Sequence, residues 1–348
     1  MMPLSKVDPE LVSIILPVFN GERFLATSIQ SCLNQTYKNI ELIIVNDNSS
    51  DRSLEIAEKY QAKDKRVSII SNSVNKKLPA SLNIGHKMAK GAYMTWTSDD
   101  NYFNSNAIEI LLKKSNETGA DIVYSDFYVI KENGSKKNPV DLENAGSLLF
   151  GNSIGASFLY KSKVFELNEG YNENLHTVED YDFWLRATLH SKFLHIKDKL
   201  YNFRSHGKSL SANIAIKDSQ VSREFNKNLH ITYLNFLKYL EIKERNKYAD
   251  LLTTMHQYRE INVDGLFKEY VEFCSLLKNV SERLDFFNYN KLQSDLDLRL
   301  RSNIQDYKDN QNINVLLLIL RNRVELLLNY DRKNSMKIFF KCLKLKNA

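Results

Sequence analysis

Residues 94–101 have the sequence MTWTSDDN, in which a short apolar segment runs directly into two adjacent carboxylates. Neighbouring Asp side chains repel each other and hold water strongly, so a fold usually places them at a strand end to bind a cation or stabilise a cationic transition state. Oxygen ligands of this kind suit Mg2+ or Mn2+, which keep coordination positions free for phosphate oxygens. The alternative is a solvated turn that caps a helix expected to begin near Ser105.

Apolar runs of strand length alternate with helical patterns around this stretch. The run LVSIILPV does not alternate between apolar and polar residues, which predicts a strand buried on both faces. Such an order predicts an α/β fold, a Rossmann-like, mostly parallel sheet with helices on both faces and ligands at the carboxyl ends of the strands. The runs lie at residues 11–18, 40–45, 67–70 and 92–97, and the helical patterns between them at residues 25–33, 53–62 and 79–90.

Two acidic sites far apart in the sequence follow strands of this predicted sheet. Asp47 follows the second strand, and Asp99 and Asp100 follow the fourth. Because parallel strands end at one edge of the sheet, this placement favours a pocket for a nucleotide and a metal ion over two unrelated turns. The alternative for Asp47 is an N-cap of the next helix.

Composition excludes several classes of protein. The 348 residues are 43% hydrophobic, which is enough apolar material for one large domain or two ordinary domains. The three cysteines are odd in number and far apart, which fits neither a disulfide framework nor a zinc site and favours a reducing, cytoplasmic setting. We expect neither a signal peptide nor a membrane-spanning helix, because no apolar run is long enough.

The net charge of +6 is concentrated at one end of the chain. Residues 313–348 hold eight Lys or Arg against Glu325 and Asp331, so this tail alone accounts for the whole excess. The other residues are neutral overall, and we therefore expect no nucleic-acid partner.

Three blocks in the first strands and turns are long and correctly spaced. They are VSIILPVFNG at residues 12–21, SCLNQTY at 31–37 and ELIIVNDNSSD at 41–51. Together they resemble the family 2 inverting glycosyltransferases, which have the A-type (GT-A) nucleotide-sugar-binding fold, and the resemblance covers roughly residues 11–210. It implies that Asp47 accepts hydrogen bonds from the uracil or ribose of the donor, and that Pro17, Phe19 and Asn20 belong to the nucleotide site.

Two positions depart from the family pattern. Many relatives have Asp-x-Asp-Asp at the end of the fourth strand, and here Thr97 replaces the first Asp. The resemblance implies a metal site at Asp99 and Asp100, and it leaves open which carboxylate binds the metal and which the donor ribose. Lys77 stands where relatives often have Gly, which affects the expected geometry of that loop.

Later blocks resemble the acceptor region of the family: GASFLY at residues 155–160, GYNE at 170–173 and TVEDYDFWLR at 177–186. The resemblance implies that Asp180 is the catalytic base, with Glu179 and Trp184 on the acceptor side. The alternatives are a helix that begins with acids because its dipole favours them, and a tryptophan that is plain core.

The block LYNFRSHGKSLS at residues 200–211 resembles the terminal strand of the family, with its Arg-x-His element. It implies that Arg204 faces the donor diphosphate and that neutral His206 completes the metal shell of Asp99 and Asp100. A structural role for His206 is the alternative.

These features divide the chain into a glycosyltransferase domain at residues 1–212 and a helical extension at residues 213–348. Near the end, apolar and basic residues alternate at helical spacing, which predicts a basic amphipathic helix within residues 333–348 that contacts an anionic membrane. The alternative is docking on the rest of the protein. The apolar residues are Met336, Phe339, Phe340 and Leu343, and the basic ones are Lys333, Lys337, Lys341 and Lys344.

The function implied by the resemblance is metal-dependent inverting transfer of a hexose or N-acetylhexosamine from a UDP-sugar to a hydroxyl of a glycan or lipid-linked acceptor. Mn2+ or Mg2+ is the expected cofactor, and bacterial surface polysaccharide assembly at the cytoplasmic face of the cell membrane is the expected setting. One alternative is a sugar-nucleotide nucleotidyltransferase, although residues 19–23, FNGER, lack the basic glycine-rich loop that would grip a triphosphate. Another is a catalytically inactive, membrane-associated scaffold of the same fold, which Thr97 would suit.

Overall fold

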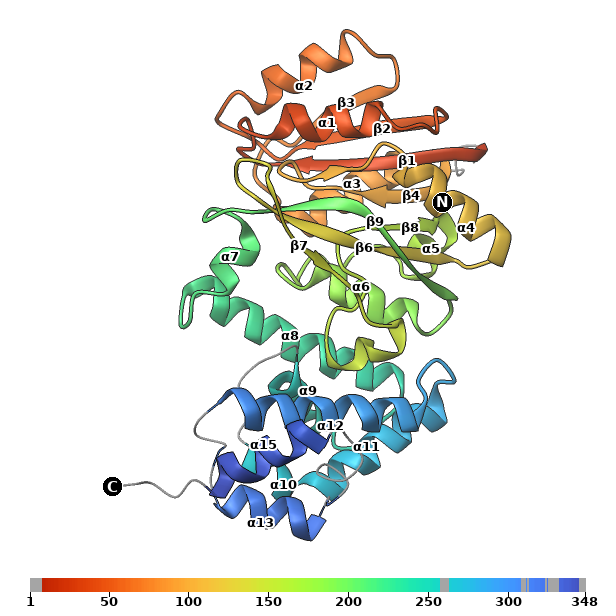
Figure 1. Ribbon diagram of the computed structural model, residues 1–348. Helices are drawn as coiled ribbons and strands as arrows, with labels where there is room; N and C mark the ends of the chain where they lie inside the picture. Colours follow the sequence, from red (N-terminus) through yellow and green to blue (C-terminus); the bar gives the residue numbers. More distant parts are fainter. Residues whose placement is uncertain are drawn as a thin grey trace. The chain divides into compact units, whose positions relative to one another are not determined.

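The computed structural model describes residues 8–256, 263–307, 311, 313–322, 324 and 332–343. Contacts divide the chain into two compact units (Figure 1). The first comprises Met1–Ala145 and Asn152–Asn228, and the second comprises Gly146–Gly151 and Leu229–Ala348. The first unit holds the sheet, and the second is helical.

The sheet of the first unit has nine strands within the described residues, in the order β3-β2-β1-β4-β8-β6-β9-β5, with β7 paired to β6. Its first half is parallel: β1 (Asp8–Val18), β2 (Ile40–Asn46), β3 (Val67–Ser71) and β4 (Gly91–Trp96). Beyond β4 the pairing is mixed, because β8 is antiparallel to both β4 and β6, whereas β6 is parallel to β9. The other bounds are β5 (Tyr102–Phe103), β6 (Ile122–Lys131), β7 (Lys136–Val140), β8 (Phe158–Lys161) and β9 (Phe193–Ser205).

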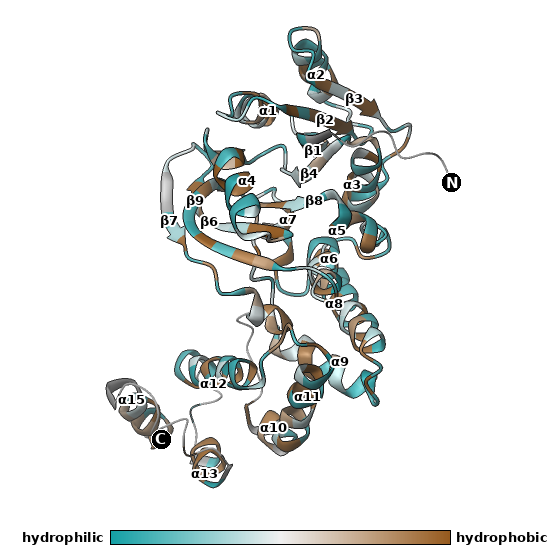
Figure 2. Cartoon of the chain, turned by 90° about the vertical axis from the view of Figure 1, so that its right-hand side faces the viewer, coloured by the Kyte–Doolittle hydropathy of each residue, from teal (hydrophilic) through white to brown (hydrophobic). Residues whose placement is uncertain are grey.

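Helices cover both faces of the parallel half, because the strands are apolar on both sides. Ile14 and Leu16 of β1 are fully buried under α1 (Leu25–Leu33) and α4 (Ala107–Thr118). Ile15 lies on the other face, where α3 (Lys77–Met88) approaches so closely that a Cβ on Gly85 would lie 2.5 Å from Cγ2 of Ile15. Figure 2 shows brown, apolar residues along β2 and β3. The predicted α/β fold with a helical extension is confirmed.

The strand register brings the predicted site segments to one edge of the sheet. Val18 pairs with Asn46, and the amide of Asp47 donates to the carbonyl of Val18 at 2.9 Å. On the other side of β1, the amide of Thr97 donates to the carbonyl of Ile15 at 3.0 Å. The turns after β1, β2 and β4 therefore lie at the same carboxyl edge.

The second unit is built around leucine and phenylalanine side chains of several helices, among them Leu252, Phe273 and Leu296, which are fully buried. It also takes in Gly146–Gly151 from the middle of the chain, which includes all but the first residue of a short 3-10 helix (Ala145–Phe150). The carbonyl of Leu149 in this helix accepts from Tyr233 Oη at 3.1 Å. No helix in the described ranges has the length and apolar character needed to cross a bilayer. The helices are α8 (Gln220–Tyr239, at whose Asn228 the first unit ends), α9 (Arg245–Met255), α10 (Val263–Lys268), α11 (Tyr270–Arg283), α12 (Tyr289–Asp306), α13 (Ile313–Asn322) and α15 (Arg332–Leu343).

Candidate active site

Asp47 binds the loop that leads into α3. Its Oδ1 accepts from Asn72 Nδ2 and from the amide of Lys76, both at 2.8 Å, and its Oδ2 accepts from the amide of Lys77 at 2.9 Å. Helix α2 (Ser53–Gln61) has Arg52 at its N-cap, so Asp47 does not cap the next helix. Instead it satisfies amides at the start of α3 and makes that loop part of the site edge.

Lys77 adopts the backbone conformation that glycine would adopt. Its φ is +72°, in the left-handed region, where an L side chain costs energy and glycine does not. The loop therefore holds Lys77 in a conformation that suits glycine and stores strain there.

The turn after β1 is tied to the turn after β2. The Asn20 side chain accepts from the amide of Ser50 at 2.8 Å, and the amide of Gly21 donates to Ser53 Oγ at 2.9 Å. Phe19 is 50% exposed at this edge, whereas Pro17 is buried within β1. An exposed aromatic ring beside a polar turn can pack against a nucleobase, and the nucleotide roles of these three residues remain predictions.

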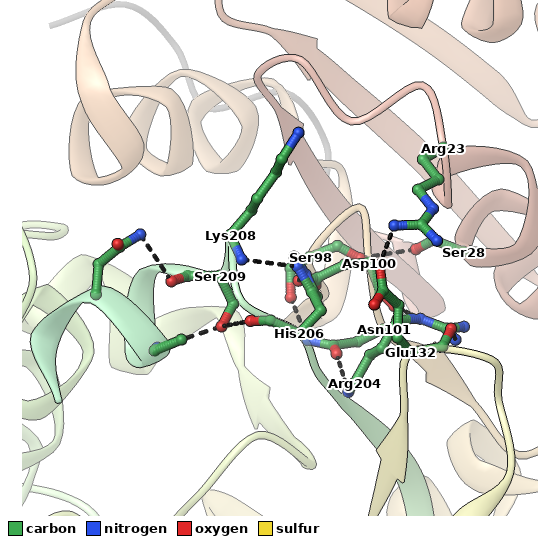
Figure 3. A network of polar contacts seen from close by, with 12 residues as sticks. Arg23, Ser28, Ser98, Asp100, Asn101, Glu132, Arg204, His206, Lys208 and Ser209 are labelled. Carbon is green, nitrogen blue, oxygen red and sulfur yellow. Dashed lines mark hydrogen bonds and ion pairs between the residues drawn. The ribbon is translucent and has the colours of Figure 1, made fainter. Parts of the chain in front are cut away.

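The carboxyl pair after β4 lies in a confined environment. Burial, and then the charge of Asp100, raise the pKa of Asp99 to about 7. Asp100 Oδ2 lies 2.9 Å from His206 Nε2, while the buried Oδ1 has no hydrogen-bond partner among the described residues (Figure 3). Thr97 is fully buried, with its hydroxyl 2.7 Å from Tyr201 Oη, so it is a core residue at the position of the missing Asp.

The donor set at this edge fits the proposed metal in its chemistry. Carboxylate oxygens and a neutral imidazole are ligands for Mn2+, and Asp100 Oδ1 is a buried acceptor that a cation would satisfy. Of the predicted ligands, Asp100 and His206 are in contact. Within the described residues, no three His, Cys, Asp or Glu side chains are already gathered as a metal site.

Arg204 links three segments of the chain. It is 5% exposed, and its guanidinium donates from Nε to the carbonyl of Asp100 at 2.8 Å and from Nη1 to the carbonyl of Glu132 at 2.7 Å (Figure 3). The guanidinium carbon also lies 4.4 Å from the centre of the Phe24 ring, a cation-π contact. Arg204 thus fixes the turn that carries the acidic pair, and contact with a diphosphate stays a prediction.

The second carboxyl pair begins helix α6 (Glu179–Ala187). Asp180 Oδ2 accepts from Asn152 Nδ2 at 2.8 Å, and Oδ1 accepts from the amide of Tyr181 at 2.7 Å. Glu179 is 3% exposed, and its Oε2 has no hydrogen-bond partner among the described residues.

The two carboxyls of this pair differ in their hydrogen bonds. Burial, and then the charge of Asp180, raise the pKa of Glu179 to about 8. Burial also raises the pKa of Asp180, but the hydrogen bonds from Tyr181 and Asn152 oppose it. The hydrogen bonds therefore favour ionisation of Asp180, whereas Oε2 of Glu179 has no such donor among the described residues.

Trp184 lies in the core below the pair. It is fully buried, and its ring centre lies 4.8 Å from that of Phe158 and 5.9 Å from that of Tyr160. The alternative of a core tryptophan therefore describes it, and its indole supports α6 without presenting a face for a sugar. The structure adds Asn152, Phe24 and Glu132 to the predicted residues, although no sequence motif marks them.

This arrangement defines a class of protein. A sheet whose parallel half presents Asp47 and the Asp99–Asp100 pair at one edge, and whose mixed half carries a carboxyl pair at the start of a helix, is the A-type fold of nucleotide-sugar-dependent glycosyltransferases. The sequence model of the family described as "Glycosyl transferase family 2" matches residues 13–192. The chain is a member of this family.

Known relatives share different extents of the chain. A glycosyltransferase of Haemophilus influenzae described as uncharacterized is 28% identical over 80% of this chain and 93% of its own. The hyaluronan synthase of Pasteurella multocida is 28% identical over 73% of this chain, which spans only 27% of that synthase. The crystal structure of Staphylococcus aureus TarS 1–349 in complex with UDP-GlcNAc superimposes with a TM-score of 0.55 over 94% of this chain and 89% of the TarS chain. The two sequences are 16% identical, so the likeness shows a shared fold.

Proposed function

We propose that this glycosyltransferase transfers a hexose or N-acetylhexosamine, with inversion, from a UDP-sugar to a hydroxyl of a glycan or lipid-linked acceptor. The observation that carries the proposal is the Asp180 side chain, which accepts hydrogen bonds from Asn152 and from the amide of Tyr181, while Oε2 of the adjacent Glu179 has no partner among the described residues. The UDP-GlcNAc complex of TarS supports a UDP-sugar donor, and the hyaluronan synthase of P. multocida supports a glycan product. Assembly of bacterial surface polysaccharide is the proposed setting.

Asp180 would act in a single displacement. Its carboxylate removes the proton of the acceptor hydroxyl while that oxygen attacks the anomeric carbon, and the bond from this carbon to the UDP oxygen breaks on the opposite face. Inversion follows from attack opposite the leaving group. A positioned base of this kind contributes about 10²–10⁴-fold to the rate.

Other residues would bind the donor. Phe19 and Asn20 lie at the edge where Asp47 organises the loop before α3, and they would contact the nucleotide. Asp99, Asp100 and His206 would hold Mn2+ or Mg2+. When bound, such an ion neutralises negative charge on the departing diphosphate.

Hydrolysis of a panel of UDP- and GDP-sugars by the full-length protein, with and without Mn2+, tests the proposal. We expect release of UDP from one or more UDP-sugars, and loss of this release on chelation. Calorimetry that finds no metal-dependent UDP binding would favour the inactive scaffold, and consumption of a nucleoside triphosphate with a sugar phosphate would favour the nucleotidyltransferase.

We also propose that α15 contacts an anionic membrane. Its Ser335, Ile338 and Cys342 are buried, while Met336 and Phe340 are 52% and 55% exposed, so the predicted apolar residues face outward. The sequences of α13 and α15 contain Arg and Lys but no Asp or Glu, which complements an anionic lipid surface and would repel a second copy of the same face. Of the predicted residues, Lys344 and the last part of the tail lie outside the described residues.

Flotation with vesicles tests this contact. We expect the protein to bind vesicles that contain phosphatidylglycerol but not pure phosphatidylcholine, and we expect Phe340→Glu to abolish binding. Val271→Glu is the matched control, because Val271 is an 80% exposed apolar residue of α11 in the same unit. Equal vesicle binding by Phe340→Glu and the wild type would contradict the proposal. So would a wild type that binds no vesicles but forms a dimer that Phe340→Glu abolishes and Val271→Glu does not.

A further inference from the structure

The side-chain amide of Asn152 is fixed in one orientation. Its Oδ1 accepts from the amides of Ile154 at 3.1 Å and Gly155 at 3.4 Å, so its NH2 group is the end that faces Asp180. A flipped amide would place an oxygen against the carboxylate and would lose both backbone donors. The orientation of Asn152 is therefore set by the loop before β8.

Glycine at position 155 allows this loop to form. Its φ is +66°, and a Cβ at this position would lie 2.9 Å from Cε1 of Phe127. The backbone amides that orient Asn152 thus come from a turn with little freedom to rearrange.

Asp180 has several ionisable neighbours. Glu179 precedes it on α6, and Asp182 on the same helix is neutralised by Arg186, whose Nη2 lies 2.7 Å from Asp182 Oδ2. From another segment, the charge of Asp180 acts on buried Tyr171, where it is among the causes that, after burial, raise the pKa of the phenol. Two adjacent carboxyls without a bound cation compete for one proton, so a donor aimed at only one of them decides which is ionised.

We propose that Asn152 is a positioning residue that selects Asp180, in preference to Glu179, as the ionised carboxyl of this pair and holds it in one rotamer. The inference rests on the proposed function, because it assumes that Asp180 is the base. Asn152 would act on the reaction only through Asp180. It acts by donating to Asp180 Oδ2, which keeps the carboxylate ready to accept the proton of an acceptor hydroxyl.

Removal of this donor should change the pH dependence of turnover. A hydrogen bond to a charged group has a strength that corresponds to a shift of about 1–2 pH units in the pKa of its acceptor. The carboxylate form of Asp180 loses stability in Asn152→Ala, so the acidic limb of the profile of kcat/KM moves to higher pH by about this amount. Asn152→Asp, which has the same shape but no donor, should shift the limb at least as far.

The experiment measures UDP release by the full-length protein at saturating Mn2+ over pH 5–9, with the UDP-sugar that the wild type hydrolyses fastest. We expect Asn152→Ala to show the shifted acidic limb with unchanged affinity for UDP. Addition of Glu179→Gln removes the competing carboxyl and should move the limb back toward the wild-type position. If Asn152→Ala fails to fold, Asn152→Ser keeps a short donor and should show a smaller shift in the same direction.

Asn168→Ala is the matched control. Asn168 is also buried, and its Nδ2 donates to the carbonyl of Phe183 on α6 at 2.9 Å, but no hydrogen bond joins it to Asp180. Its loss should lower stability without moving the limb. The inference would be overturned if the pH profile of Asn152→Ala superimposed on that of the wild type, or if its rate were reduced equally at every pH. Inactivity of Asp180→Asn in the same assay would show that the proposed base is correct even so. A wild-type protein that releases UDP from no donor would instead overturn the proposed function.

Discussion

Replacement of Lys77 by Gly should leave stability unchanged or increase it, whereas the same replacement of Lys76 should decrease it. Both lysines are exposed, and both donate a backbone amide to Asp47. Their backbones differ, because φ is +72° at Lys77 and −100° at Lys76. The pair therefore isolates the cost of the left-handed conformation.

The magnitude follows from two opposing contributions. A left-handed backbone costs an L residue about 1–2 kcal/mol, and this cost disappears in Lys77→Gly. Glycine loses about 0.5–1 kcal/mol more conformational entropy on folding, which applies to both variants. We expect Lys77→Gly to gain up to about 1.5 kcal/mol and Lys76→Gly to lose about 0.5–1 kcal/mol.

Urea unfolding followed by tryptophan fluorescence measures this difference in the right part of the chain. The chain has two tryptophans, Trp96 and Trp184, and both belong to the first unit. The signal therefore reports on the sheet that carries the loop. Equal destabilisation by the two substitutions would refute the argument that strain is stored at Lys77.

Three other changes test separate features. Burial lowers the pKa of His86 to about 4, so the unfolded chain binds an extra proton between about pH 4 and the ordinary value of 6.5, and the free energy of unfolding should fall by about 3 kcal/mol as the pH drops through this range. His86→Gln should flatten the plot of unfolding free energy against pH, and an unchanged slope would contradict this. Gly21→Ala places a Cβ 1.9 Å from Asp99 Oδ2 and should weaken Mn2+-dependent UDP binding, measured by calorimetry, at least about tenfold. Gly207→Ala is the control, because nothing lies within 4 Å of its added Cβ, and equal affinities of the two variants for UDP would count against the prediction. Truncation after residue 228 removes most of the unit that buries Leu149 and should give an aggregation-prone chain by light scattering; a monodisperse product with the full-length unfolding midpoint would disprove it.

The parallel half of the sheet could be predicted because its strands are mostly apolar runs that do not alternate between apolar and polar residues. Val12 to Leu16 are fully buried, so neither face needs polar residues and the run is legible without knowing its neighbours. The mixed half is less regular, and β6 pairs with β9 through register shifts at Asp126. Such pairing depends on contacts between distant segments, which periodicity alone does not encode.

The candidate site likewise has residues that could be predicted from the sequence and residues that could not. Asp47, Asp99 and Asp180 follow strands or begin a helix, so their positions follow from element order. The contact of Asn152 with Asp180 joins a loop to the first turn of α6, 28 positions apart, and that of Arg204 with Glu132 joins segments 72 positions apart. Side-chain partners of this kind depend on how loops pack, and no spacing rule predicts them.

The most direct test of the proposed function compares Asp180→Asn with the wild type in two measurements on one preparation: the rate of UDP release from the preferred UDP-sugar, and the affinity for UDP by calorimetry. The account predicts that the rate falls by about 10²–10⁴-fold while the dissociation constant for UDP stays within about twofold, because Asp180 acts on the acceptor hydroxyl and not on the nucleotide. A variant that releases UDP at the wild-type rate would contradict it.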